Sequence, residues 1–179
     1  MKTWMHWSLI SLGLLLLALS TPFIKPTFIF LEHRSDISGF IASADPAERD
    51  LPPLTRSLLL RSLHGDTVPY ATRLLIDRLY PESYQGRTWR WIIAYSTWGC
   101  LVEKTLTEPE RLTIIAHFAR TGGGHTGLAE TALSRFGRPL RNLTPSETAT
   151  LIALLKNPSR YNQPAQLETA SARLLTEPN

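Results

Sequence analysis

The chain is poor in residues that cross-link a fold. It has a single cysteine, Cys100, in 179 residues, so no disulfide can form within the chain. No cysteine and histidine cluster has the spacing of zinc ligands, and we expect neither a structural metal nor a bound cofactor. Cys100 lies in the apolar run Trp-Gly-Cys-Leu-Val. This context favours a buried thiol over one that links two chains.

Strand patterns are also lacking, because no segment alternates apolar and polar side chains convincingly. Charged residues make up only 19% of the chain, and 19 Lys and Arg against 15 Asp and Glu give a net charge of +4. The basic residues are scattered and do not alternate with aromatic ones, so nucleic acid is not an expected partner. The excess fits an anionic partner such as a membrane surface or a phosphorylated lipid. Solvated arginines explain it equally well.

One long apolar run is present, between Trp7 and Ile24 at the N-terminus. About 20 residues cross a bilayer as a helix, and tryptophans such as Trp4 and Trp7 favour the interface. We therefore predict that residues 1–32 form a membrane anchor. A cleaved signal peptide is the alternative, because Ala18-Leu19-Ser20 offers small residues for cleavage. Either interpretation places the remaining chain outside the cytoplasm or close to a membrane.

The rest of the chain divides into a linker and a helical domain. Residues 33–50 are polar and contain Gly39 and Pro46, so we predict a linker. Residues 51–179 show helical periodicity almost throughout, with capping boxes at Thr107 and Thr144. The predicted helices cover about 51–64, 67–80, 88–106, 108–120, a short segment ending at 137, 145–157 and 165–176. The fold class is therefore all-α.

The segment from Gly127 to Asn162 carries the most specific pattern. It joins a Phe-Gly step, a capping box, an apolar helix and the turn string Lys-Asn-Pro-Ser-Arg-Tyr-Asn. This order and spacing resemble the C-terminal part of the family 51 glycosyltransferases, the peptidoglycan transglycosylases of class A penicillin-binding proteins and of monofunctional enzymes. The resemblance runs from Arg87 to Tyr161 without a gap, about half the chain. The matched positions include Arg87, Thr88, Glu103, Thr107, Glu110, Gly122, Gly124, Gly127, Phe136, Gly137, Glu147 and Arg173.

The resemblance implies a divergent and shortened lysozyme-like transglycosylase domain behind an N-terminal transmembrane helix. The corresponding location is the bacterial inner membrane, crossed once, with residues 51–179 on the periplasmic or outer face. The implied partners are the membrane, lipid II or glycan strands, and wall-synthesis proteins.

The catalytic positions of that family are not kept. The family's second active-site glutamate falls on Thr113 and the asparagine of the same motif falls on His117. The basic cluster that handles the substrate's phosphates falls on Trp91, Ile92 and Tyr95, and no Glu-Asp-x-x-Phe segment is present. A general base contributes roughly 10²–10⁴-fold to rate, and a threonine hydroxyl does not ionise near neutral pH.

His117 is the one candidate base, because imidazole titrates near neutrality and lies one turn from Thr113. A structural histidine is the simpler interpretation, and no catalytic residue is matched. Two further patterns also have structural explanations. Glu103 and Glu110 suggest a carboxylate pair, yet Glu110 belongs to a capping box. The tryptophan-rich run 89–98 suits either a membrane-contacting face or a packed core helix.

Four functions remain open at this point. The first is a membrane-anchored, transglycosylase-like protein of cell-wall biogenesis that is catalytically degenerate and acts as a binding or scaffold module. The alternative is an active peptidoglycan glycosyltransferase that polymerises lipid II with a non-standard catalytic set and Mg²⁺. A lysozyme-like hydrolase would need a carboxylic acid in a cleft. A plain interaction protein would carry only an inherited resemblance.

Overall fold

The computed structural model describes residues 21–84, 88–122, 125–156 and 164–176. Within these ranges the chain is helical apart from turns and an isolated β-bridge between Arg120 and Thr126. After a helical segment at 21–32, the elements are α2 (Arg34–Ser43), α3 (Pro46–Arg49), α4 (Pro53–Ser62), α5 (Val68–Leu79), η1 (Pro81–Tyr84), α6 (Thr88–Thr105), α7 (Glu108–Phe118), α8 (Leu128–Phe136), η2 (Leu140–Asn142), α9 (Pro145–Lys156) and α10 (Pro164–Thr176). The predicted all-α class is confirmed for the described part.

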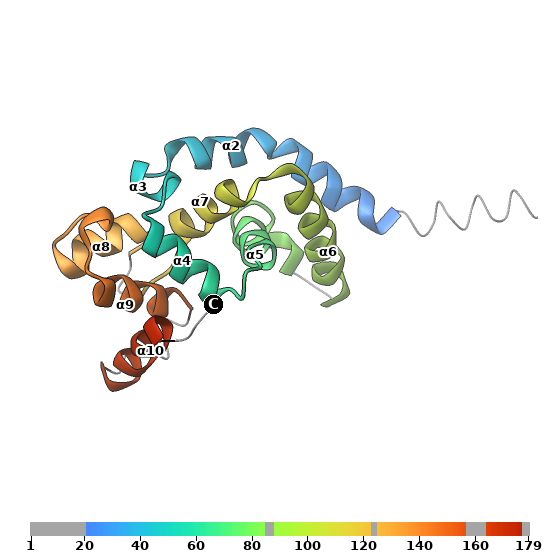
Figure 1. The fold of residues 1–179 in the computed structure, drawn as a ribbon. Helices are drawn as coiled ribbons and strands as arrows, with labels where there is room; N and C mark the ends of the chain where they lie inside the picture. The colour runs from blue at the N-terminus through green and yellow to red at the C-terminus, as the bar shows by residue number, and fades with distance from the viewer. Residues whose placement is uncertain (1–20, 85–87, 123–124, 157–163, 177–179) are drawn as a thin grey trace, which may run out of the picture.

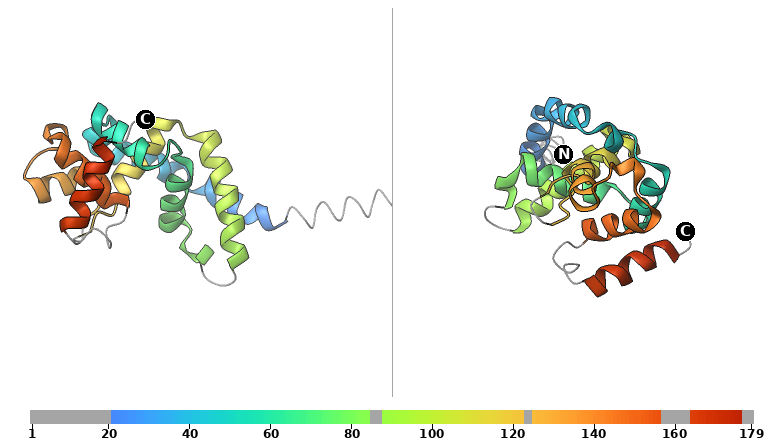
Figure 2. Two further views of the ribbon diagram at one scale, coloured as in Figure 1. Left: turned by 60° about the horizontal axis from the view of Figure 1, so that its bottom comes forward. Right: turned by 90° about the vertical axis from the view of Figure 1, so that its left-hand side faces the viewer.

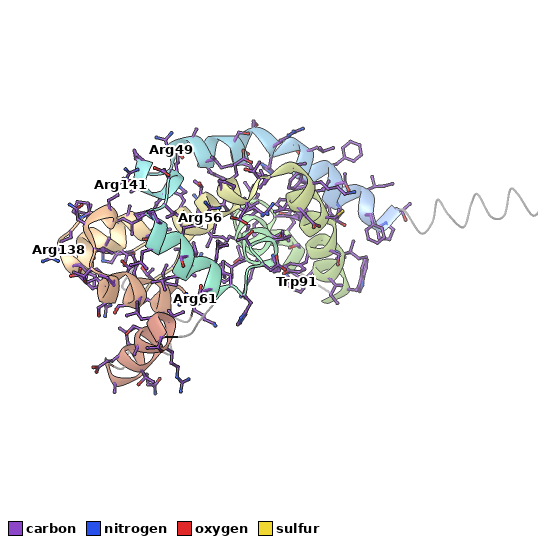
Figure 3. All side chains as sticks on the ribbon, viewed as in Figure 1. Arg49, Arg56, Arg61, Trp91, Arg138 and Arg141 are labelled. Carbon is purple, nitrogen blue, oxygen red and sulfur yellow. The ribbon has the colours of Figure 1, made fainter. Side chains whose placement is uncertain are left out.

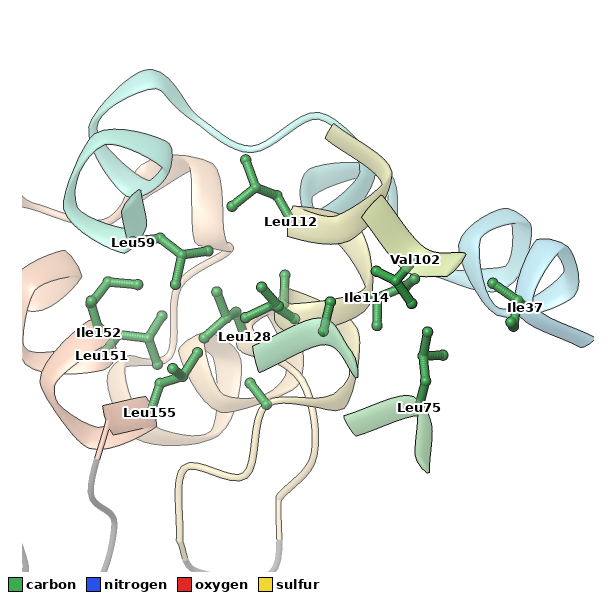
Figure 4. Packing of buried hydrophobic residues seen from close by; sticks show 14 of the residues in the cluster. Ile37, Leu59, Leu75, Val102, Leu112, Ile114, Leu128, Leu151, Ile152 and Leu155 are labelled. Atoms are coloured by element: carbon green, nitrogen blue, oxygen red, sulfur yellow. The ribbon is translucent and has the colours of Figure 1, made fainter. Parts of the chain in front are cut away.

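Two helices, α7 and α9, form the centre of the fold. Five consecutive residues of α7, Leu112–Ala116, are buried, and so is the run Leu151–Leu155 of α9. A helix with apolar side chains all round must be covered on every side. The other helices supply this cover: α2, α3, α5 and α8 pack on α7, and α4, α8 and α10 pack on α9. Figure 4 shows Ile114, Leu128 and Leu155 within this core.

The helix ends follow local sequence chemistry. At the start of α7, Glu110 Oε2 accepts hydrogen bonds from the Thr107 backbone N–H and hydroxyl, both at 2.7 Å. The second capping box repeats this at α9, where Glu147 Oε2 accepts from Thr144 N at 2.8 Å. These bonds hold the pKa of Glu147 below its usual value. Gly137 ends α8 in the left-handed conformation, with φ +64°. Both predicted capping boxes are confirmed.

The predicted linker is wrong in its structure, because residues 34–43 and 46–49 are helices packed on the domain. Asp45 caps the start of α3, because its side chain accepts a hydrogen bond from Ala47 N at 2.7 Å. Pro46 occupies the first turn, where a backbone N–H would have no partner within the helix, so its missing N–H costs no hydrogen bond. Ile37 and Glu48 are 2% and 3% exposed. This segment therefore contributes to the core rather than only joining two parts.

The helical segment 21–32 also packs on the domain. Trp98 of α6 donates its indole N–H to the carbonyl of Pro26 at 2.9 Å, and Phe30 packs edge-on against the Trp98 ring, with centroids 5.2 Å apart. Phe30 is 1% exposed. Figures 1 and 2 show this segment at the end of the molecule opposite α10.

The predicted anchor lies mostly outside the described residues, since residues 1–20 are not among them. In the part of the chain that the structure describes, no helix is both long and apolar enough to cross a membrane. The anchor at 1–32 therefore stays a prediction. Within its last turns, however, Phe30 faces the domain core and not a lipid phase.

The prediction of a buried thiol at Cys100 is wrong. Trp98 and Val102 of α6 are both fully buried, whereas Cys100 is exposed. Residue 100 follows Trp98 by two positions, about 200° around a helix, so it lies on the opposite face from the buried stripe. The apolar neighbours of Cys100 in sequence therefore do not surround it in space.

Candidate functional site

The side chain of Thr113, which lies at the position of the family's glutamate, is hydrogen-bonded to the backbone of its own helix. Its hydroxyl donates to the carbonyl of Pro109 at 3.0 Å, and the residue is 2% exposed. A hydroxyl with its hydrogen committed to a backbone carbonyl adds nothing to proton transfer. The position that the resemblance assigns to a base is therefore part of the core.

The three residues at the phosphate-handling positions lie on α6, and none of them is cationic. Trp91 and Tyr95 stack with ring centroids 4.9 Å apart, and Tyr95 donates its hydroxyl to the carbonyl of Pro69 at 3.3 Å. Burial is the main cause that raises the pKa of Tyr95, so this phenol stays neutral. Ile92 is 52% exposed. These positions offer aromatic and aliphatic surface, not charge for a departing phosphate.

His117 is placed beside a buried carboxylate that the sequence patterns do not single out. Its Nδ1 lies 3.2 Å from Glu48 Oε2, and the two side chains are 30% and 3% exposed. Glu48 comes from α3, 69 residues earlier in the chain, so the pair joins α3 to the last turn of α7. The signal that could have found it is the Asp45-Pro46 helix start, which predicts a helix where composition predicts a linker.

Glu48 uses its other oxygen to cap α8. Oε1 accepts a hydrogen bond from the backbone N–H of Ala129 at 2.9 Å. The N-cap residue of α8 is Gly127, which has no side chain to do this. A carboxylate at a helix N-terminus also interacts favourably with the helix dipole. We call Glu48, His117, Gly127 and Ala129 the Glu48 junction.

Gly127 is required in this junction for two separate reasons. Its φ of +96° suits glycine, and a Cβ there would lie 2.9 Å from Glu48 Oε1 and 3.3 Å from the His117 carbonyl oxygen. Its N–H donates to the carbonyl of Ala119 at 2.8 Å, which closes the loop between α7 and α8. The backbone thus lies so close to the Glu48 carboxylate that a side chain at position 127 would clash with it.

The junction holds one chemically useful group. When Glu48 is ionised, it can only accept hydrogen bonds, and His117 Nδ1 is then the donor to it. This leaves the lone pair of Nε2 for a proton from outside, the arrangement by which a carboxylate orients a histidine base. Both Glu48 oxygens are occupied and the residue is buried, so Glu48 itself acts only through His117.

A second histidine cluster lies at the surface of α8. His125 Nδ1 lies 3.1 Å from Glu130 Oε1, and His125 Nε2 lies 2.8 Å from the Ser134 hydroxyl. The hydrogen bond from His125 is the main cause that lowers the pKa of Glu130. The order serine, histidine, carboxylate resembles a nucleophile triad. Glu130 is 59% exposed, so water competes for each of these hydrogen bonds. The cluster therefore links His125 to the surface of α8 and is not a buried catalytic centre.

A large hollow lies elsewhere in the described structure, along α4. Its volume is about 1330 Å³, and it is bounded by α4, the segment before it, η2, and the ends of α9 and α10. Its cationic lining side chains are Arg56, Arg61, Arg141 and Lys156. Its apolar lining side chains are Leu51, Pro52, Pro53, Leu60 and Leu174. We call this the basic hollow, and Figure 3 shows three of its arginines.

Metal ligation finds no support among the described side chains. They bring together no group of three histidine, cysteine, aspartate or glutamate residues that could hold an ion. We therefore assign no residue to Mg²⁺. The features available for chemistry or binding thus include the imidazole of His117 and the basic hollow.

Comparison with known proteins places these features in context. The Transglycosylase family matches residues 74–177. A biosynthetic peptidoglycan transglycosylase from Cronobacter sakazakii is 33% identical over 92 residues, which is 50% of this chain and 37% of that protein. One of the same name from Pectobacterium carotovorum is 36% identical over 80 residues, or 44% of this chain and 32% of that protein. The chain thus matches about a third of these relatives' length. No solved structure gives a significant match.

Proposed function

The chain belongs to the transglycosylase family, and we propose that it acts in peptidoglycan assembly. Its role there is that of a binding or scaffold module that has lost polymerase activity. The proposal includes a single N-terminal membrane anchor and a domain on the periplasmic or outer face of the bacterial inner membrane. Both curated relatives are named as biosynthetic peptidoglycan transglycosylases, which supports the pathway.

One observation carries the loss of activity. The positions that the family uses for a carboxylate base and for phosphate-binding cations hold a buried threonine and an aromatic surface. Thr113 is 2% exposed and hydrogen-bonded within α7, and Trp91 stacks on Tyr95. Glycosyl transfer to a sugar hydroxyl needs a base to take the proton and positive charge to stabilise the departing diphosphate. Neither requirement is met at these positions.

A polymerisation assay tests the proposal. Purified full-length protein in detergent is incubated with lipid II and Mg²⁺, and a known transglycosylase runs in parallel as the positive control. We expect no glycan chains from this protein and full polymerisation in the control. Glycan chains that scale with protein concentration would overturn the proposed loss of activity.

The second candidate is an active glycosyltransferase that uses His117. The observation that favours it is the 3.2 Å contact of His117 Nδ1 with the buried Glu48, which leaves Nε2 to accept a proton. If the polymerisation assay is positive, His117→Ala and His117→Gln should both abolish turnover. Glu48→Gln should lower it while the protein stays folded. Full activity in a folded His117→Gln variant would remove this residue from the mechanism.

A further inference from the structure

The basic hollow differs from the Glu48 junction in size and in accessibility. At about 1330 Å³ it exceeds the usual 300–1,000 Å³ of a small-molecule site. One wall is the exposed face of α4, with Arg56 and Arg61. The other is formed by Arg141 of η2, Lys156 at the end of α9 and Leu174 of α10. A hollow of this size has room for a peptide segment of several residues.

Three of the four cations of the hollow are held by contacts within the fold. Arg56 pairs with Glu108 at 2.7 Å while half exposed, and Arg141 pairs with Asp50 at 3.2 Å, where the carboxylate is 86% exposed. Exposed ion pairs of this kind are weak and exchange partners readily. Arg61 donates a hydrogen bond to the carbonyl of Leu174 at 2.7 Å and so links α4 to α10.

The lining argues for one class of ligand. The described residues of the hollow include no phenylalanine, tyrosine or tryptophan, and its described walls combine cationic with aliphatic side chains. The cations come from α4, η2 and the end of α9, and Figure 3 shows Arg56, Arg61 and Arg141 at separate positions, so a single phosphate would not reach all of them. Leu51, Leu60 and Leu174 line the same hollow and supply its apolar surface.

We propose that the basic hollow binds an extended acidic peptide segment of a partner protein. Its leucine-like side chains pack against Leu51, Leu60 and Leu174, and its carboxylates reach Arg56, Arg141 and Lys156. Arginine accepts carboxylates in bidentate geometry, and an apolar centre with a charged rim is the usual anatomy of a specific interface. The inference deepens the scaffold role and rests on the proposed function for its biological setting, although its test is independent of catalysis.

Fluorescence anisotropy measures the binding directly. The probe is a fluorescein-labelled twelve-residue peptide in which glutamates and leucines are interspersed with serines, and it is titrated with full-length protein in detergent. A second probe carries glutamine at every glutamate. We expect saturable binding of the acidic probe only, weakened by salt because its charges are exposed. The double variant Arg56→Gln/Lys156→Gln should weaken binding by about 5- to 30-fold.

The matched control removes the same charge outside the hollow. Arg49→Gln/Arg138→Gln lowers the net charge equally, and neither residue lines the hollow. This variant should bind the acidic probe with nearly unchanged affinity. Equal losses in the two double variants would overturn the proposal, since only non-specific attraction would then remain.

Two other outcomes also count against the peptide. Equal binding of the glutamine probe would leave no role for the cations. Saturable binding of tripolyphosphate, lost in Arg56→Gln/Lys156→Gln and accompanied by no binding of the acidic probe, would identify a phosphate ligand instead. Since neither readout involves lipid II, a positive polymerisation assay would overturn the proposed function and leave this measurement standing.

Discussion

The Glu48 junction and the basic hollow are both charged, but they use charge in opposite ways. In the junction, a carboxylate that is 3% exposed has both oxygens bonded, one to His117 and one to Ala129. In the hollow, Arg56 and Arg141 are 50% and 55% exposed, and the ion pair that each makes is weak. The junction thus stabilises the fold, whereas the hollow presents cationic side chains to solvent.

Burial thus separates charges that support the fold from charges that are available to a ligand. A buried charge must have its hydrogen bonds satisfied, so changing it alters stability first. An exposed charge in a concave surface costs the fold little and is available to a ligand. The following substitutions test whether the two regions behave in these two ways.

The largest effect is expected for Gly127→Ala. The left-handed φ of +96° disfavours alanine, and the new Cβ would meet Glu48 Oε1 at 2.9 Å and the His117 carbonyl at 3.3 Å. Strain and overpacking together should lower the free energy of unfolding by about 3 kcal/mol. Urea unfolding followed by circular dichroism measures it.

Gly137→Ala is the matched control for backbone strain alone. Its φ is +64°, and a Cβ added there would have no neighbour within 4 Å. We expect a loss of about 1 kcal/mol. Equal losses for the two alanine variants would show that the close approach to Glu48 contributes nothing.

Glu48→Ala should have the next largest effect, about 2 kcal/mol of unfolding free energy. The substitution removes the cap of α8 and leaves the Ala129 N–H without its acceptor. Glu48→Gln retains an oxygen for that N–H and should cost about half as much. If Glu48→Ala unfolds at the same urea concentration as the parent protein, the junction has no structural role.

Glu147→Gln should have an intermediate effect on stability, because Glu147 is hydrogen-bonded in the capping box of α9. Bonds from Thr144 lower its pKa in the folded state. Its contribution is therefore present above the pKa of an unfolded glutamate and is lost as pH falls through the lower folded value. Stability measured from about pH 7 to about pH 3 should fall less steeply in Glu147→Gln than in the parent. Parallel curves would contradict the role of the cap.

The smallest effect is expected in the hollow. Arg141→Gln breaks only its exposed pair with Asp50 and should change the free energy of unfolding by less than about 0.5 kcal/mol. Differential scanning calorimetry at neutral pH compares it with the parent. A loss above about 1 kcal/mol would mean that Arg141 is structural and that the contrast between the two regions fails.

Local sequence rules account for most of the helices. Thr107 and Thr144 cap where predicted, and Gly137 ends α8, because these signals depend on neighbours three or four positions away. Composition misleads at 33–50, where polarity outweighs the Asp45-Pro46 start of α3. The prediction for Cys100 fails because apolar sequence neighbours do not reveal which face of α6 is covered.

The candidate site is less accessible to sequence reasoning. His117 can be singled out, but its partner Glu48 lies 69 positions away on a segment whose composition predicts a linker. The basic hollow combines residues from 50 to 174, and only the packing of α4 on α9 and α10 brings them together. Contacts of this range follow from tertiary structure and leave no local pattern.

The hydrogen bond that Glu48 accepts from the Ala129 N–H bears on where this domain begins. The family match starts at residue 74, yet the cap of α8, well inside that match, is supplied 81 positions upstream. We therefore expect the folding of the matched part to be thermodynamically coupled to α3. A fragment that starts at residue 74 would expose the first turn of α8 and part of α7. We expect the independently folding body to extend at least as far back as α3.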